Sequence, residues 1–328
     1  MELPPALREA VDRAIAGARP DDLARAAAVL SARYRSETRD GRFHVADSTA
    51  ALAYAAYRLP ATYAAIRQCI ETIGEAAPEF APTTLLDVGA GPGSATWAAV
   101  ERWPSLKSVD LLEGSPEFRA LGHALSAQGL SAALHWREAD LRSDLPDLPR
   151  SDLVVLGYVL DELPPEKRGA LIDRLWQATA QILLVVEPGT PSGWRRILEA
   201  RNRLIQSGAQ LVAPCPHAGR CPLTPPDWCH FSRRVARSKI HLMTKGAEVP
   251  WEDEKYIYLA ASRGPIPSPL ARVIAPPRSA SGRVWLKLCK SDGTAGERLF
   301  TKREGDVFKA ARRVDWGESL LRSDPAQH

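Results

Sequence analysis

The sequence of 328 residues has no run of eighteen or more apolar residues, so no segment is expected to cross a membrane as a helix. Acidic residues interrupt the amphipathic start, MELPPALREAVDRAIAG, which makes it unlike a secretory signal. The composition, with 45% hydrophobic and 25% charged residues, excludes a disordered chain and predicts a globular one. We therefore expect a cytoplasmic protein that has no membrane partner.

Cysteine is scarce, and the five cysteines are an odd number. In a reducing compartment, clustered thiols are more often metal ligands or redox groups than disulfides. Three of the five fall within CPHAGRCPLTPPDWCHFSRR, residues 215–234, and they lack the close pairing of the commonest zinc fingers. Cys69 lies in the helical pattern YAAIRQCIETI and is expected to be an ordinary buried thiol.

Acidic residues are nearly missing from one part of the chain. Residues 195–245 hold 10 Lys and Arg residues against 2 Asp and Glu residues, and residues 266–328 hold 12 against 7, although the whole chain carries only +4. Such a concentration of positive charge is typical of a surface that meets a phosphate backbone. The predicted RNA-binding residues are Arg220, Arg233, Arg234 and Arg237.

Hydrophobic periodicity divides the chain into three predicted regions. Residues 1–80 keep helical spacing, and Pro20 followed by two aspartates marks a helix start. In residues 81–265, apolar strands such as TTLLDVG and QILLVVEPG alternate with helical stretches, which predicts a doubly wound α/β sheet that carries a cysteine-rich, basic segment at 211–240. Residues 266–328 become Pro-rich and then alternate, with turn signals SDG and AGE, which predicts a small basic β element and a tail.

A glycine loop follows the first predicted strand in LLDVGAGPG. Gly89, Gly91 and Gly93 let the backbone approach a ligand closely, and the next helix begins with its N-terminus at that ligand. A dinucleotide would fit the same loop, but Asp87 at the strand end disfavours a pyrophosphate and suits the positive charges of S-adenosylmethionine. The loop therefore favours S-adenosylmethionine as the cofactor.

Two further acids complete the predicted cofactor site. Glu113 ends the next strand, twenty residues after Gly93, where it can accept hydrogen bonds from ribose hydroxyls. Asp140 follows the third strand and can accept a hydrogen bond from the adenine amino group. A glycine loop followed along the chain by Glu113 and Asp140 is a more specific signal for this cofactor than the loop alone.

Together with YRLPATYAAI, LVAPCPHAGRCPL, DWCHFSRR and KREGDVFKAARRVDWG, this set resembles the methyltransferase-like family of mitochondrial small-ribosomal-subunit assembly factors and their bacterial relatives. The resemblance covers roughly residues 25 to 320. It implies a class I, Rossmann-like methyltransferase fold, binding to small-subunit ribosomal RNA or an assembly intermediate, and a role in ribosome biogenesis and translation. In mitochondrial members it also implies a 4Fe-4S cluster, whose ligands by position are Cys215, Cys221, Cys229 and Cys289.

The chemistry of the cysteines leaves two kinds of metal site open. Four thiolates satisfy either a tetrahedral zinc ion or an iron-sulfur cluster, while loose spacing and a distant fourth ligand suit the bulkier cluster better. Zinc is the alternative. His217 and His230 are close enough in sequence to replace a cysteine as ligand.

A catalytic residue is also missing from the sequence. The Asn/Asp-Pro-Pro-aromatic loop of many base-amine methyltransferases is absent after the fourth strand, which reads DLVVLGYVLDELPPEK. Asp161 and Glu162 in that stretch could orient a substrate, although capping of the next helix is the favoured interpretation. Two functions follow as hypotheses: a cluster-bearing assembly factor that binds ribosomal RNA, expected to be a monomer, or an active ribosomal RNA methyltransferase. A radical enzyme is disfavoured, since four thiolates leave no open iron.

Overall fold

The computed structural model describes residues 1–127, 129–143, 145–238, 242 and 249–320. Residues 239 and 240 of the predicted cysteine-rich segment, and residues 321–328 of the predicted tail, lie outside the described residues.

The chain begins with helices, as the sequence predicts: α1 (Pro5–Ile15), α2 (Pro20–Arg35), α3 (Ser48–Tyr57) and α4 (Leu59–Ala76). Pro20 opens α2 with Asp21 and Asp22 in its first turn, where acids interact favourably with the helix dipole. The stretch DSTAALAYAAYRLPATYAAIRQCIETIG, which keeps helical spacing throughout, forms two helices. The break falls at Arg58, because Pro60 has no amide hydrogen to continue the helical hydrogen bonds.

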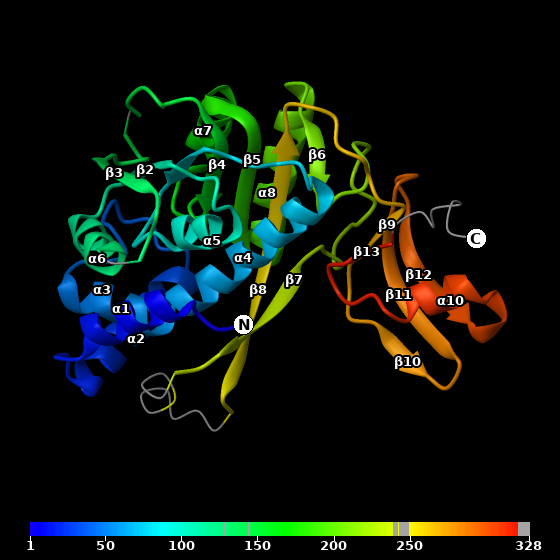
Figure 1. The fold of residues 1–328 in the computed structure, drawn as a ribbon, viewed down its shortest axis with the longest axis horizontal. Helices are drawn as coiled ribbons and strands as arrows, with labels where there is room; N and C mark the ends of the chain where they lie inside the picture. The colour runs from blue at the N-terminus through cyan, green and yellow to red at the C-terminus, as the bar shows by residue number, and fades with distance from the viewer. Residues whose placement is uncertain (128, 144, 239–241, 243–248, 321–328) are drawn as a thin grey trace.

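A mixed sheet of eight strands forms the centre of the molecule (Figure 1). Its path is β3-β2-β1-β4-β5-β8-β6, and β7 pairs with β8 beside β6. The first five strands of this path are parallel, whereas β8 runs antiparallel to β5, β6 and β7. The strands are β1 (Thr84–Val88), β2 (Ser108–Glu113), β3 (Ala133–Glu138), β4 (Ser151–Gly157), β5 (Thr179–Pro188), β6 (Gln210–Ala213), β7 (Phe231–Ala236) and β8 (Trp251–Ser262). This order, with one antiparallel strand inserted next to the last, is the class I methyltransferase fold and confirms the predicted Rossmann-like α/β core.

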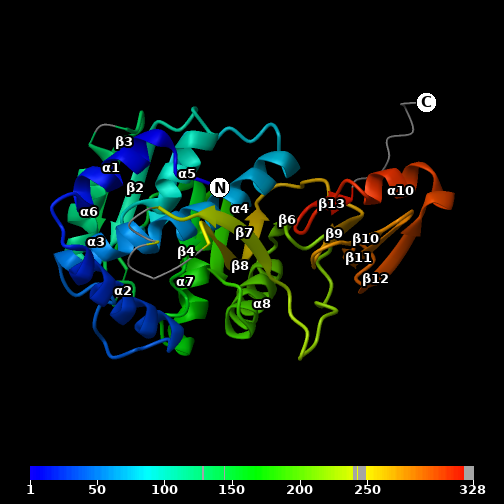
Figure 2. The ribbon, with the colours of Figure 1, turned by 90° about the horizontal axis from the view of Figure 1, so that it is seen from below.

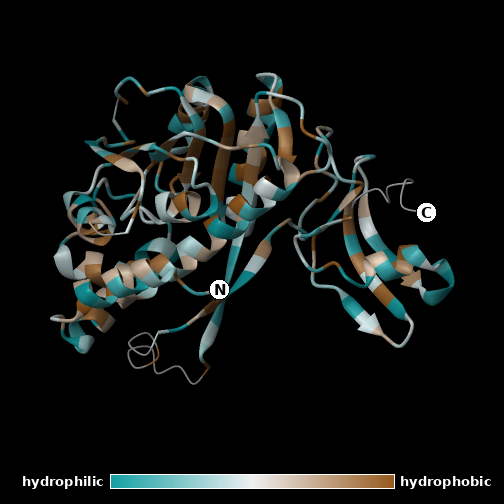
Figure 3. Cartoon of the chain, viewed as in Figure 1, coloured by the Kyte–Doolittle hydropathy of each residue, from teal (hydrophilic) through white to brown (hydrophobic). Residues whose placement is uncertain are grey.

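Helices cover both faces of this sheet. Figure 2 shows α4 and α5 (Ser94–Arg102) on one face, and α7 (Pro165–Ala178) and α8 (Pro191–Gln206) on the other, while α6 (Pro116–Ser126) packs near β2. The central strands are buried on both faces, so they consist of nearly continuous apolar residues, drawn in brown in Figure 3. Their carboxyl ends all meet at one edge of the sheet, where ligands bind in open α/β folds.

A second, smaller sheet lies beside the first (Figure 1). It has the order β10-β11-β9-β13, with β12 paired to β11, and it contains its own buried cluster around Val273, Leu286 and Phe300. Its elements are β9 (Ala271–Val273), β10 (Arg278–Ala280), β11 (Arg283–Lys290), β12 (Ala295–Thr301), the 3-10 helix η1 (Lys302–Glu304), α10 (Asp306–Ala311) and β13 (Ser319–Leu320). The SDG signal forms the turn between β11 and β12, with Gly293 at φ +84°. The turn predicted at AGE is wrong, because residues 295–297 already pair with β11 as part of β12.

The domain limits predicted at residues 80 and 265 stay predictions. Within the described residues, no helix combines the length and apolar composition that crossing a bilayer would require.

Candidate functional site

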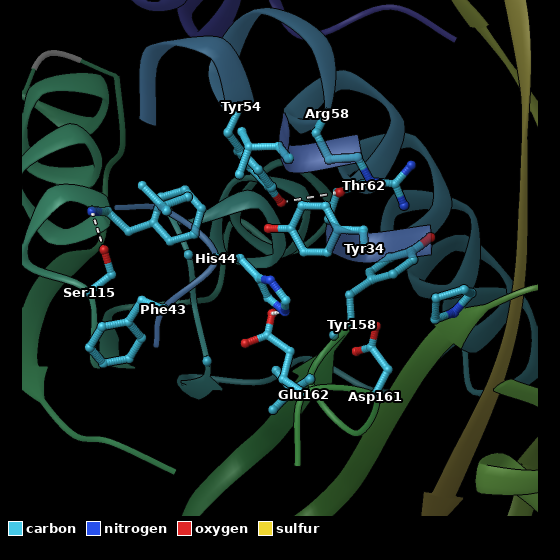
Figure 4. Close-up of a pocket in the computed structure, with 18 of the residues that line it drawn as sticks. Tyr34, Phe43, His44, Tyr54, Arg58, Thr62, Ser115, Tyr158, Asp161 and Glu162 are labelled. Atoms are coloured by element: carbon cyan, nitrogen blue, oxygen red, sulfur yellow. Dashed lines mark hydrogen bonds and ion pairs between the residues drawn. The ribbon is translucent and has the colours of Figure 1, made fainter. Parts of the chain in front are cut away.

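A cavity of about 400 Å³ opens at the carboxyl ends of the parallel strands. The ends of β1, β2, β3 and β4 contribute to its lining, and the N-terminal helices α2, α3 and α4 close it from the other side (Figure 4). The residues that line it include Tyr34, Phe43, His44, Tyr54, Arg58, Gly89, Gly91, Glu113, Asp140, Arg142, Tyr158, Asp161, Glu162 and Glu254. The volume is of the size that holds a nucleoside-like small molecule.

The glycine loop forms one wall of this cavity. Gly89 and Gly91 line it, and both have positive φ angles, +65° and +55°, which disfavour residues with a side chain. A Cβ atom on Gly89 would lie 2.5 Å from Cγ2 of Val159, so a larger residue would push the loop away from β4. Gly93, also predicted as a cofactor residue, precedes α5 as its N-cap and does not line the cavity.

Asp87 lies beneath the loop and does not line the cavity. Its carboxylate, on a residue only 2% exposed, accepts hydrogen bonds from the Thr96 backbone N–H at 3.1 Å and the Thr96 hydroxyl at 2.8 Å. Burial raises the pKa of Asp87 to about 7. Asp87 thus joins α5 to the end of β1, and its predicted contact with the cofactor's positive charges stays a prediction.

Glu113 joins the glycine loop to the end of β2. One carboxylate oxygen accepts from the backbone N–H of Gly91 at 2.8 Å, and the other accepts from that of Ser115 at 2.7 Å. Each carboxylate oxygen keeps further lone-pair capacity, which can accept ligand hydroxyls. Burial raises the pKa of Glu113, although these two hydrogen bonds oppose the shift.

Asp140 faces the same cavity from the loop after β3. It forms a bidentate pair with Arg142, with Nε to Oδ1 at 2.8 Å and a terminal nitrogen to Oδ2 at 2.9 Å, and this bonding lowers the pKa of Asp140. The guanidinium carbon of Arg142 lies 4.3 Å from the centre of the Phe43 ring. The structure therefore brings Gly89, Gly91, Glu113 and Asp140 together around one space.

The end of β4 supplies groups that the sequence alone did not indicate. Tyr158 has a φ of +60°, which is uncommon for a tyrosine, and its hydroxyl donates to Glu254 at 3.1 Å. Arg58 forms a bidentate pair with the same carboxylate at 2.7 and 2.8 Å. Strained residues cluster at ligand sites, and here the contacts of Tyr158 connect β4, α4 and β8.

Asp161 and Glu162 also line the cavity, and neither caps the next helix. Helix α7 begins at Pro165 with Pro164 at the N-cap, and no side chain bonds to that cap. The capping interpretation of Asp161 and Glu162 is therefore wrong, since both carboxylates face the space at the end of β4.

A second, much smaller cavity of about 30 Å³ is lined by the four predicted metal ligands, Cys215, Cys221, Cys229 and Cys289. Three come from the segment between β6 and β7, and Cys289 comes from β11 of the smaller sheet. Burial raises the pKa of Cys289 to about 12, and the Cys215 and Cys221 thiols add to the shift. Among the described residues, no three His, Cys, Asp or Glu side chains are arranged to hold a single metal ion.

Two buried arginines flank the cysteine cavity. Arg201, 1% exposed, lines it and donates to the backbone oxygens of His217 and Gly219, both at 2.7 Å, while its Nε has no partner among the described residues. Arg272, 2% exposed, donates to the backbone oxygens of Pro214 and Gly317. Both guanidinium groups are thus buried against carbonyl oxygens, and neither forms an ion pair with an acidic residue in the described part of the chain.

The remaining cysteine and the two histidines are placed differently. Cys69 is fully buried in α4, as the sequence predicts. Nε2 of His217 lies 3.6 Å from Sγ of Cys289. The ring of His230 packs between Trp228 and Trp316, with ring centres 5.2 and 5.1 Å away.

Two of the predicted RNA-binding arginines are neutralised by acids of β8. The antiparallel pairing of β7 and β8 sets Arg234 opposite Asp253, with a hydrogen bond of 3.0 Å, and Arg237 reaches Glu252 at 3.3 Å. Arg233 lies opposite Glu254 in the register, and Arg220 is exposed in the cysteine-rich segment. The β7–β8 ribbon is therefore less positive than the sequence suggests.

Positive charge without acidic partners occurs instead on the smaller sheet. Arg283 begins β11 and pairs with Thr301 across the sheet, beside Lys302 and Arg303. All three side chains are exposed, and no described acidic residue forms an ion pair with them. We call these three residues the hairpin cations.

Comparison with known proteins gives one family. Residues 48–321 match the family model Rsm22, described as "Mitochondrial small ribosomal subunit Rsm22". The human "Ribosome assembly protein METTL17, mitochondrial" is 30% identical over 290 residues, which cover 82% of this chain and 62% of the human protein. The Schizosaccharomyces pombe "Rsm22-cox11 tandem protein 2, mitochondrial" is 25% identical over 286 residues, covering 71% of this chain and 38% of the yeast protein. The chain thus spans less than two thirds of either relative.

Among solved structures, magnesium protoporphyrin IX methyltransferase from Synechocystis with bound S-adenosylmethionine aligns with 14% identity and a TM-score of 0.41, covering 76% of this chain and all of that one.

Proposed function

Because this chain belongs to the family described as mitochondrial small ribosomal subunit Rsm22, we propose that it is a methyltransferase-like protein of ribosome assembly. In this proposal it binds S-adenosylmethionine in the larger cavity, carries a 4Fe-4S cluster at the smaller one, and binds small-subunit ribosomal RNA. The family match and the name of METTL17 support the assembly role.

One observation carries the cofactor proposal: the glycine loop, Glu113 and Asp140 share one cavity at the carboxyl ends of β1, β2 and β3. These strands are neighbours in the sheet, so the three groups lie in a row that an extended nucleoside can follow. Glu113 would hold the ribose hydroxyls and Asp140 the adenine amino group. When bound, S-adenosylmethionine supplies an activated methyl group.

We expect S-adenosylmethionine to bind this chain and NAD not to bind, because a pyrophosphate would meet the carboxylate of Glu113 at the glycine loop. Replacing Glu113 with Ala should weaken binding by about 1–3 kcal/mol, since the ribose hydroxyls would lose their buried partner. Calorimetric titration of both ligands into wild-type and E113A protein measures this. Glu117, a half-buried acid in the first turn of α6 that does not line the cavity, supplies a control, and E117A should bind normally. Equal binding of NAD, or an unaffected E113A variant, would place the nucleoside elsewhere.

The cluster proposal is supported by the charges around the four cysteines. Four thiolates that bind one divalent ion, or an oxidised 4Fe-4S cluster, carry two net negative charges. Arg201 and Arg272 supply two buried positive charges that form no ion pair with a described acidic residue, and a buried charge without an ion pair is costly. An anionic metal-thiolate centre between them would remove that cost.

A cluster is favoured over zinc by the arrangement of the thiols. The ligands of a tetrahedral zinc ion converge on one point at about 2.3 Å. In the described residues the four cysteines surround a common space, yet no three of them converge in this way. A cluster with several iron atoms takes each thiolate at a separate corner, which suits the loose spacing of Cys215, Cys221 and Cys229 along the chain and the distant Cys289.

The RNA proposal is supported by the excess of positive charge in residues 195–245 and in the smaller sheet. Because acids of β8 neutralise Arg234 and Arg237, the hairpin cations and the exposed Arg220 are the groups most open to phosphate. If the cluster joins the smaller sheet to the cysteine-rich segment, both sets of cations belong to one rigid unit.

A further inference from the structure

The smaller sheet buries only one of its two faces. Along β11, Val284, Leu286 and Leu288 are buried, and the residues that alternate with them belong to the opposite face of the sheet. Phe308 of α10 packs with the buried residues, and Figure 1 shows α10 beside β11 and β12. An antiparallel sheet with one covered face usually carries polar residues on the other face, which we term the open face.

The open face instead carries an apolar pair. Trp285 of β11 lies opposite Leu299 of β12 in the register, so both side chains belong to this face. Leu299 is 42% exposed, and Trp285 is partly exposed. Trp285 packs against neither of the two buried cores of the described residues, whereas the partly buried Trp136, Trp228 and Trp316 do. Aromatic side chains in such positions are enriched in binding surfaces.

Positive charge surrounds this pair. Arg278 of β10 lies opposite Trp285 on its other side, with the guanidinium carbon 5.8 Å from the ring centre. Both side chains of its ion pair with Glu297 are half or more exposed, so this pair is weak and can open to another anion. The hairpin cations follow, since Arg283 precedes Trp285 by two residues on the same face. Glu297 is the only acidic residue of β11 and β12, so this end of the open face is predominantly positive.

The other end of the open face is already in contact with the cysteine-rich segment. Lys287 donates to Asp227 of that segment at 2.5 Å, and Cys289 lines the cysteine cavity. Both follow Trp285 along β11 on the same face. The contact between the two parts of the molecule is therefore made by residues 287 and 289, and Trp285 lies one step beyond it.

An aromatic ring between cations suits single-stranded RNA. In a duplex the base faces are stacked inside the helix, so phosphates and groove edges are what a protein meets, and cations alone would bind them. An unpaired base can stack on a tryptophan while the flanking phosphates reach neighbouring cations. The open face offers both groups side by side.

We propose that Trp285, with Leu299 and Arg278 beside it, stacks an unpaired base of RNA, and that the hairpin cations hold the adjacent phosphates. This inference rests on the proposed binding of RNA. It goes further in naming single-stranded RNA as the ligand class and the open face of the smaller sheet as its site.

Two substitutions of Trp285 separate stacking from charge. W285L keeps an apolar side chain without the ring, and W285F keeps a ring. In fluorescence anisotropy with the full chain and a short single-stranded RNA, W285L should bind at least about fivefold more weakly than wild type, because a base–aromatic stack is lost. Its slope of log affinity against log salt should stay unchanged, since no phosphate contact is lost. W285F should bind nearly as well as wild type, and a duplex of the same sequence should bind W285L and wild type equally.

Trp251 supplies the matched control. It is a 42% exposed tryptophan of β8, outside the smaller sheet, and W251L should bind single-stranded RNA as the wild type does. Binding of the duplex by W285L reports that this variant is folded. A cross-link needs no variant: wild-type protein irradiated with the same RNA carrying 5-iodouridine should form an adduct in the tryptic peptide of residues 284–287, which contains Trp285.

The outcomes separate this inference from the function on which it rests. A W285L variant that binds single-stranded RNA as tightly as wild type overturns the stacking site, and so does a cross-link that forms only outside residues 284–287, whatever the variants show. In either case RNA binding through phosphates stands, and the apolar pair would be a cross-strand contact or a surface for a protein. If wild-type protein binds neither RNA, even at low salt, the RNA proposal and the stacking site fail together.

Discussion

Replacing Cys289 with Ser is expected to remove most of the bound iron and to expose residues 210–320 to proteolysis. Cys289 lies in β11 of the smaller sheet, while the other three cysteines lie between β6 and β7, so the bound cluster would join the two parts. The binding energy of a structural metal centre is folding energy for the segment that it orders. Iron analysis and limited proteolysis of C289S measure the effect. Binding of S-adenosylmethionine should be nearly unchanged, because its cavity lies at the ends of the parallel strands.

The matched control is Cys69→Ala, which removes a buried thiol from α4, outside the cysteine cavity. That variant should keep its iron and its protease resistance in the region 210–320. A C289S protein with full iron content would show that another residue is the fourth ligand. His217 would then be the first to test, since its Nε2 is 3.6 Å from the Cys289 sulfur, whereas the His230 ring is packed between two tryptophans.

Neutralising the hairpin cations is expected to weaken binding to structured RNA strongly and for all sequences alike. In the triple variant R283Q/K302Q/R303Q, each lost phosphate contact should lower the slope of log affinity against log salt by about 0.7–0.9. Affinity at low salt should fall by at least about tenfold. The variant would release fewer counter-ions from the RNA when it binds, and this release is a favourable part of the binding free energy. Filter binding or fluorescence anisotropy across a salt series measures both quantities.

Arg234 provides the comparison for this prediction. It is exposed like the hairpin cations but is already paired with Asp253, so R234Q should change the salt slope little. Arg233, Arg234 and Arg237 are the arginines of this region that the sequence predicts to bind RNA. Reversing the charge of all three together would be a less specific test, because it would also disturb the pairing of β7 with β8. If the triple variant kept the wild-type RNA affinity and the wild-type salt slope, the hairpin cations would be ordinary solvated surface residues that do not contact RNA.

The fold and the cofactor loop could be predicted because their signals are local. A strand followed by glycines needs only neighbouring residues to form, and Glu113 and Asp140 follow their own strands at the same edge of the sheet. Asp87 shows the limit of this reasoning. Its place at the end of β1 does not by itself show whether it lines the cavity. In the structure, Thr96 of α5 donates two hydrogen bonds to the Asp87 carboxylate, and Asp87 is not among the lining residues.

Other parts of the site depend on contacts between distant segments. Tyr34 and His44 reach the cavity because the N-terminal helices fold over the ends of the strands, and no periodicity in residues 1–80 indicates that contact. The neutralisation of Arg234 depends on the register of β7 against β8, which sets Asp253 opposite it. Likewise, Asp161 precedes a helix in sequence as a cap would, yet two prolines place the helix start beyond its reach.

The most direct test of the account is the metal and sulfide content of anaerobically purified protein, measured with its visible absorption spectrum. We expect iron and acid-labile sulfide in equal amounts, about four of each per chain, with broad visible absorption and little zinc. One zinc ion per chain, without iron or sulfide, would contradict the proposed cluster and make the four cysteines a zinc site.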